Sequence, residues 1–249
     1  MVRAKKIAAI GVEDGIAGAV HQNPTTRTTA NDKSSTDQPE AAKLQPVSKS
    51  ETTVANDNRS NAKLLAVPFT SQAPTANWDT LHNEACEEAS AIMAAAYFSG
   101  DTRSILPADE VEADLIALAQ WSIKTFGSSL DIATEETAKM LRDVYQLNAE
   151  VRHNLSENEL KQLIAENKLV IMPINGQRIG NPHYRQPGPL YHMLLVRGCT
   201  ETRIVTNDSG TKFSENHSYT LKKLTNALVD WSHEKDTVMP ATGVTVVWK

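Results

Sequence analysis

A cysteine lies at the start of an alanine-rich segment, "NEACEEASAIMAAAYF", residues 83–98. Cys86, Ala89 and Met93 are spaced so that they share one face of a helix over 86–98. A cysteine on such a face is commonly a packing residue. In the first helical turn, however, the unpaired backbone N–H groups and the helix dipole favour a thiolate and can receive an oxyanion. Cys86 is therefore a candidate nucleophile for acyl transfer, with core packing as the alternative.

A thiol nucleophile needs a base, and His192 is the best placed of the seven histidines. It opens the apolar strand "HMLLVRG" directly after a Pro- and Gly-rich loop, residues 175–191. A histidine at the point where a loop enters a core strand can lie at the rim of a site. The other six lie in the N-terminal segment or in polar, loop-like stretches: His21, His82, His153, His183, His217 and His233.

An orienting group for His192 follows from the hairpin expected over 192–208. If its turn is the three-residue loop Cys199–Glu201, His192 lies opposite Asp208 on the neighbouring strand. A carboxylate there would hold the imidazole in one tautomer. A loop one residue different would place Asn207 or Ser209 opposite His192 instead, and "NDSG" could also be an ordinary turn.

Three further features bear on this chemistry. Gln72, in "VPFTSQAP", precedes Cys86 by 14 residues, and its amide could be the second donor of an oxyanion hole. Loop 175–191 and Trp78 could shape a substrate cleft, although Trp78 could equally pack in the core. Glu87 and Glu88 follow Cys86 directly, and their charge would oppose a thiolate if they faced it.

The composition divides the chain into a tail and one domain. Residues 1–63 contain no Phe, Trp, Tyr or Cys and are largely polar from about residue 22, which predicts a disordered tail. Residues 64–249 are long enough for a single core. Helices are expected first, followed by a largely antiparallel sheet, which makes a two-layer α+β domain. The expected helices are 86–98, 107–127, 132–146, 156–168 and 220–232, and the expected strands are 149–153, 169–174, 192–198, 203–208 and 243–248.

Charge and hydropathy exclude several classes of protein. The chain has 25 Lys and Arg against 30 Asp and Glu, so it offers no basic surface for nucleic acid. No apolar run is long enough for a transmembrane helix or a signal-peptide core. Two cysteines cannot form a disulfide scaffold, although a bridge between Cys86 and Cys199 is possible. These features leave the compartment undetermined, with the cytoplasm as the default.

Taken in order, "VPFTSQAP…NW…EACEEASAIMAAAYF", "YHMLLVRG" and "IVTNDSG" resemble the cysteine peptidases related to the bacteriocin-leader-processing family, which have a papain-like fold. The resemblance covers residues 64–210. It implies Cys86 as nucleophile, His192 as general base, Asp208 as orienting group and Gln72 as oxyanion donor. It also implies a peptide or protein substrate and no metal or cofactor. Family members often have Gly or Pro after the cysteine, where this chain has Glu87, and the sequence shows none of the transporter domains commonly fused to leader peptidases.

Other interpretations remain open at this point. A papain-like domain without catalysis could bind peptides or act as a surface module, and Glu87 and Glu88 favour that reading. The same triad could run transpeptidation or amidase chemistry. A zinc site formed by His82, Cys86, His192 and Cys199 is the least favoured, since it lacks closely spaced ligand pairs.

Overall fold

The computed structural model describes residues 62–249. The disordered tail expected over 1–63 therefore lies outside the described residues, except for its last two positions. Lys63 already belongs to a strand, β1 (Lys63–Leu64), which pairs with the strand that carries His192.

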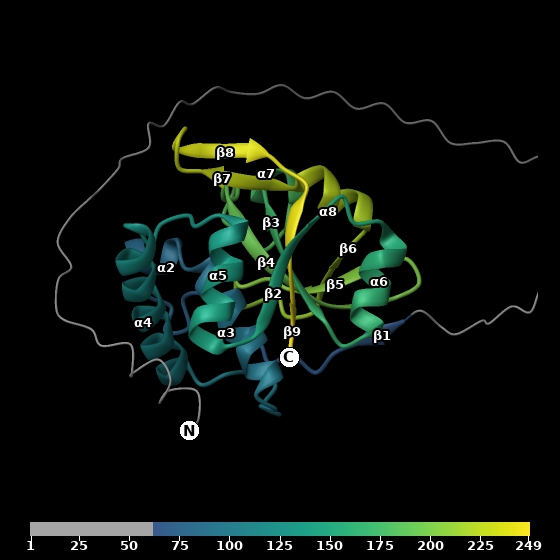
Figure 1. The fold of residues 1–249 in the computed structure, drawn as a ribbon, viewed down its shortest axis with the longest axis horizontal. Coiled ribbons are helices and arrows are strands. Elements are labelled where there is room, and N and C mark those ends of the chain that lie inside the picture. Colours follow the sequence, from purple (N-terminus) through teal and green to yellow (C-terminus); the bar gives the residue numbers. More distant parts are fainter. Residues whose placement is uncertain (1–61) are drawn as a thin grey trace, which may run out of the picture. The chain divides into compact units, whose positions relative to one another are not determined.

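One antiparallel sheet forms the centre of the domain, with strand order β2-β9-β3-β4-β5-β6 and β1 attached to β4. The C-terminal strand β9 is inserted between β2 and β3, so the last strand of the chain is an inner strand of the sheet (Figure 1). A separate hairpin, β7–β8, stands beside it. The strands are β2 (Asn148–His153), β3 (Leu169–Ile174), β4 (His192–Cys199), β5 (Ile204–Asn207), β6 (His217–Tyr219), β7 (Val229–Ser232), β8 (Thr237–Pro240) and β9 (Gly243–Trp248).

The expected N-terminal helical layer covers one face of this sheet. It consists of α3 (Cys86–Phe98), α4 (Ala108–Phe126) and α5 (Thr134–Tyr145), preceded by the short α2 (Thr80–Asn83). Helix α3 packs on β4 and lies against both α4 and α5. The small side chains of α3 allow this close approach, and its residues from Cys86 to Ala96 are all buried. Gly127 ends α4 with a φ of 88°, a left-handed backbone conformation that favours glycine at a helix C-terminus.

Helices also cover the second face, which the two-layer expectation left open. These are α6 (Glu157–Ala165) and α8 (Leu221–Ala227), with α7 (Gly176–Ile179) beside α8. In Figure 1, α6 and α8 lie on the opposite side of the sheet from α3, α4 and α5. Neighbouring residues of β9 show the two faces: Val244 lines an apolar pocket of about 280 Å³ with residues of α6 and α8, whereas Thr245 donates a hydrogen bond to Thr134 of α5. Coverage on both faces explains why "LVIMPI" of β3 is wholly buried.

The helix expected over 220–232 is wrong in its second half. Helix α8 ends at Ala227, and Leu228 has an extended backbone with ψ of 131°. The next residues form β7, in which the carboxylate of Asp230 accepts hydrogen bonds from the Thr134 backbone N–H and the Tyr191 hydroxyl. Tertiary contacts have therefore overridden the helical pattern. Within residues 62–249, no helix is both long and apolar enough to cross a membrane.

Candidate active site

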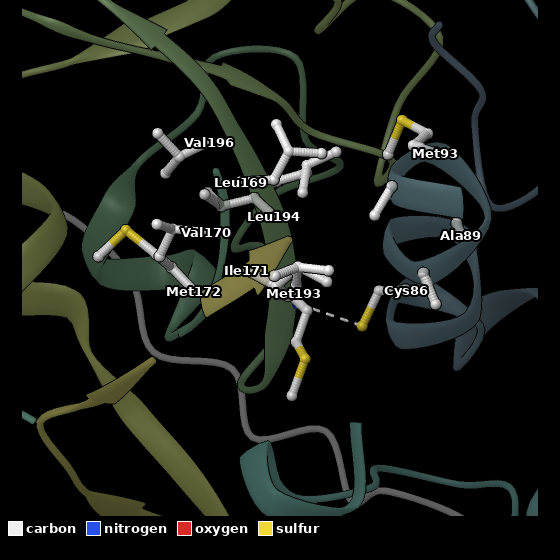
Figure 2. Packing of buried hydrophobic residues seen from close by; sticks show 14 of the residues in the cluster. Cys86, Ala89, Met93, Leu169, Val170, Ile171, Met172, Met193, Leu194 and Val196 are labelled. Carbon is white, nitrogen blue, oxygen red and sulfur yellow. Dashed lines mark hydrogen bonds between the residues drawn. The ribbon is translucent and has the colours of Figure 1, made fainter. Parts of the chain in front are cut away.

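Cys86 is the first residue of α3, and its side chain points at β4 (Figure 2). The backbone N–H of Met193, the second residue of β4, donates a hydrogen bond to the Cys86 sulfur over 3.2 Å. The Cys86 side chain is buried, with 4% of its surface exposed. The tip of α3 and the start of β4, 107 positions apart in the chain, thus meet at this sulfur.

His192 is the first residue of β4, immediately before Met193. Its Nε2 lies 2.9 Å from Oδ1 of Asp208, and both side chains are buried. The structure therefore brings together the residues that the sequence proposes as base and orienting group. Because Nε2 is engaged with Asp208, Nδ1 is the ring nitrogen left to exchange a proton with another group.

The hairpin register expected for this pair is wrong, although the pair itself forms. Cys199 is paired with Ile204, so the turn holds four residues, and the register shifts at a bulge between Val196 and Gly198. Leu195 then faces Asn207, the last residue of β5. Asp208 consequently reaches His192 from beyond the end of the strand. Asn207 and Ser209, the alternatives, contact Arg197 and Gln72 instead.

Asp208 accepts hydrogen bonds from several buried groups besides His192. The Tyr184 hydroxyl and the Asn181 amide donate to Oδ2 over 2.6 and 2.9 Å. The Tyr219 hydroxyl lies at 3.3 Å from the same oxygen, and the Gly210 N–H donates to Oδ1 over 3.1 Å. Burial raises the pKa of Asp208, but His192 and these donors outweigh burial and leave the pKa lowered. Asp208 is therefore an ionised carboxylate.

Two of these donors come from loop 175–191, which the sequence suggests as part of a cleft. Asn181 is completely buried and also donates to Ser214 Oγ, and the Tyr184 ring packs edge-on against the His192 ring. Sequence reasoning missed both residues. The available signal was "NPHY", a cluster of hydrogen-bonding side chains in the loop that leads into the strand of the proposed base.

The Cys86 thiol donates its hydrogen bond to the carboxyl group of Glu87. Sγ lies 3.0 Å from Glu87 Oε2, and Glu87 and Met193 are the hydrogen-bond partners of this sulfur in the described part of the chain. Burial raises the pKa of Cys86 strongly, the charge of Glu87 and its hydrogen bond raise it further, and the Met193 N–H opposes them. The sulfur is therefore a protonated thiol in this arrangement.

Gln72 lies close to both halves of the site, but its amide is occupied. Its backbone N–H donates to the carbonyl of Ser209, the residue after Asp208. Its Nε2 donates to the carbonyls of His82 and Asn83, over 2.8 and 2.9 Å. Both amide hydrogens thus hold the segment that leads into Cys86. An oxyanion could receive one of them only after a carbonyl had been released.

His82 is not in a polar loop, as its sequence context suggests, but is 2% exposed within α2. Its Nδ1 lies 2.7 Å from Asp79, and its Nε2 lies 3.0 Å from Glu112 of α4. This bridge fastens α2 to α4, and through the His82 carbonyl it also fixes Gln72. Trp78, in contrast, is 46% exposed and does not pack in the core.

The described residues around Cys86 and His192 form neither a disulfide nor a metal site. Cys86 and Cys199 are both buried and are not bridged to each other. Among residues 62–249, no three His, Cys, Asp or Glu side chains are grouped as metal ligands.

A helical layer on an antiparallel sheet, with a cysteine at a helix start and a His–Asp pair at the adjacent ends of two neighbouring strands, is the architecture of the papain-like cysteine peptidases. The model of the Peptidase C39-like family matches residues 64–238, and the chain belongs to this family. Membership supports a function of the peptidase type.

Two further comparisons add little to the family match. A crystal structure of a candidate C39-like peptidase from Bacillus anthracis is 15% identical in sequence, with a TM-score of 0.49. The alignment covers 76% of this chain and 98% of that one. No curated protein matches the chain.

Proposed function

We propose that the chain is a cysteine peptidase that hydrolyses peptide bonds through Cys86, His192 and Asp208. One observation carries the proposal: His192 is held by Asp208 at 2.9 Å, and the N–H of the very next residue binds the Cys86 sulfur. The nucleophile and the base are therefore anchored to adjacent positions of β4. With Nε2 bound to Asp208, Nδ1 of His192 is the atom that would accept the thiol proton.

In the proposed reaction, Cys86 Sγ attacks the carbonyl carbon of the scissile bond while His192 takes its proton. The backbone N–H of Cys86 and the amide of Gln72 stabilise the oxyanion, once Gln72 has released a carbonyl of the 82–83 segment. His192 returns the proton to the leaving amine, and a thioester on Cys86 remains. Water activated by His192 then hydrolyses the thioester.

The test is cleavage of a proteome-derived peptide library, read by mass spectrometry. We expect Cys86→Ala and His192→Ala to abolish cleavage. Gln72→Ala should retain a slow reaction, reduced by about 10²–10³-fold, because one oxyanion donor is lost. Cleavage by Cys86→Ala at the wild-type rate would refute the proposal.

A peptide-binding module without catalysis is the second candidate, and specific contacts favour it. The thiol donates a hydrogen bond to Glu87, and both amide hydrogens of Gln72 are donated to backbone carbonyls. Cleavage of bound peptides, measured together with alkylation by iodoacetamide at neutral pH, separates the two functions. A chain that binds peptides, cleaves none of them and leaves Cys86 unmodified would support the module.

A further inference from the structure

Two groups with opposite effects on the ionisation of the thiol form hydrogen bonds with the Cys86 sulfur. The Met193 N–H donates to it, which favours a thiolate, whereas the Glu87 carboxyl accepts a hydrogen bond from the S–H group, which favours the thiol. A thiol has one hydrogen to donate. While that hydrogen is directed at Glu87, it is not available to His192.

Glu87 lies in surroundings that do not suit a purely structural carboxyl group. It is 1% exposed, and its Oε1 has no hydrogen-bond partner among the described residues. An unpaired buried carboxyl oxygen costs stability, so stability alone does not explain why a carboxyl group is placed beside the sulfur. The charged and titratable groups that interact with Cys86 or Glu87 include Glu88 on the same helix, Asp131 between α4 and α5, and Tyr184 and Tyr191 before β4.

We propose that Glu87 is a positioning residue that keeps Cys86 in a resting state, by holding the thiol proton on the sulfur and away from His192. The nucleophile is released when the carboxyl group turns away, and the proton then passes from Sγ to Nδ1 of His192. This inference deepens the proposed peptidase function by giving the site an inactive state. Its test depends on the thiol alone and requires no substrate.

The experiment measures the rate of iodoacetamide alkylation at Cys86 against pH, by mass spectrometry of the peptide that contains it. Burial raises the pKa of the Glu87 carboxyl group well above its usual range, so its charge develops only at raised pH, where it opposes ionisation of the thiol. Glu87→Gln removes this ionisable group and keeps the size of the side chain. A thiolate then forms at lower pH, so the alkylation midpoint should move down. Below the midpoint, alkylation should accelerate by about tenfold for each unit by which the thiol pKa falls.

Glu88→Gln is the matched control. It makes the same carboxyl-to-amide change at the next buried position, where the carboxyl accepts a hydrogen bond from Ser122 and makes no hydrogen bond with the sulfur. We expect its alkylation profile to stay close to that of the wild type. Equal profiles for the wild type and Glu87→Gln, or equal shifts for Glu87→Gln and Glu88→Gln, would overturn the proposal.

Cys199 serves as an internal control for loosening of the fold, because it is also buried. Glu87→Met, which replaces the carboxyl group with an apolar side chain of similar length, is the second variant. Acceleration confined to Cys86 in either variant supports the proposal. Acceleration of both cysteines together in both variants overturns it, since burial would then control the thiol. If Cys86 responds as expected and the wild type cleaves no peptide, the peptidase function fails while the role of Glu87 stands.

Discussion

At the residue scale, Asp208 is the carboxylate on which the polar groups of the site converge. Its two oxygens accept hydrogen bonds from His192, Gly210, Asn181, Tyr184 and Tyr219. A buried carboxylate with this many donors stays ionised and fixed in place. Tyr184 makes the shortest of these contacts and also packs on the His192 ring, so it orients both members of the pair.

Tyr184→Phe should therefore weaken catalysis while it preserves the packing on His192. Loss of a donor that lowers the pKa of Asp208 raises that pKa, and the acid limb of the activity profile should move to higher pH. A hydrogen bond to a charged group contributes about 1.5–3 kcal/mol, so kcat should fall by about tenfold or more, with KM little changed. The measurement is kcat and KM for a cleaved peptide between pH 4 and 9.

Tyr219→Phe is the control for this prediction, because the Tyr219 hydroxyl makes the longer contact with the same oxygen, at 3.3 Å. Its profile should move less than that of Tyr184→Phe. An unshifted acid limb in Tyr184→Phe would argue that the hydroxyl only fills space.

The residue types and their order in the chain were sufficient to propose Cys86, His192 and Asp208, since a thiol, an imidazole and a carboxylate serve this chemistry in few combinations. The contact with Glu87 could not be predicted in the same way. Helical spacing distinguishes an inner from an outer face only when one face is exposed to water. Helix α3 is buried on every side, so Glu87 is as deeply buried as Ala89.

At the scale of elements, α3 carries two adjacent buried carboxyl groups in its first turn. Burial raises the pKa of Glu88 to about 7, against the hydrogen bond that it accepts from Ser122. Between about pH 4.5 and 7 the folded chain holds a proton on Glu88 that the unfolded chain has released. The contribution of Glu88 to the unfolding free energy is therefore largest at low pH, and it is lost as the pH rises through 7.

Glu88→Gln should remove this dependence, because the amide is neutral at every pH and can still accept the Ser122 hydrogen bond. The shift corresponds to about 3 kcal/mol of unfolding free energy. The unfolding free energy of the variant, minus that of the wild type, should therefore be larger at pH 8 than at pH 5. Urea unfolding at both pH values measures the gain, and an equal difference between variant and wild type at the two pH values would contradict it.

The expected elements were most accurate where local signals were strong. Helix α3 and strand β3 have the expected bounds, and a capping box of Ser156 and Glu159 begins α6 at the start of the helix expected over 156–168. The errors arose where long-range contacts decide. The bulge in β4 set the register of β5, and contacts of Asp230 with Thr134 and Tyr191 drew the end of the expected helix into β7.

At the scale of the whole molecule, the chain order of helices and strands predicted an α+β domain but not the order of its strands. The insertion of β9 between β2 and β3 joins residues 74 to 100 positions apart, and no local pattern encodes it. The sequence also did not predict that α6 and α8 cover the second face of the sheet. Both helices are short, and no repeated strand–helix unit indicates the face on which each one packs. A wholly apolar strand such as β3 was the available sign that both faces are covered.

Residues 1–61 contain no aromatic residue and no cysteine, and the buried core that the structure describes is drawn from residue 65 onward. We expect a chain of residues 62–249 to unfold with the same free energy and the same urea m-value as the full chain, because m follows the surface exposed on unfolding.

A chain of residues 66–249 is the informative comparison. It lacks β1 and Leu65, whose carbonyl accepts hydrogen bonds from the buried Arg197 guanidinium over 3.0 and 2.7 Å. Loss of these charge-assisted bonds and of the β1 pairing should cost about 2 kcal/mol or more. If removal of residues 1–61 already costs as much as removal of residues 1–65, the N-terminal segment contributes to the fold and the domain begins earlier than Lys63.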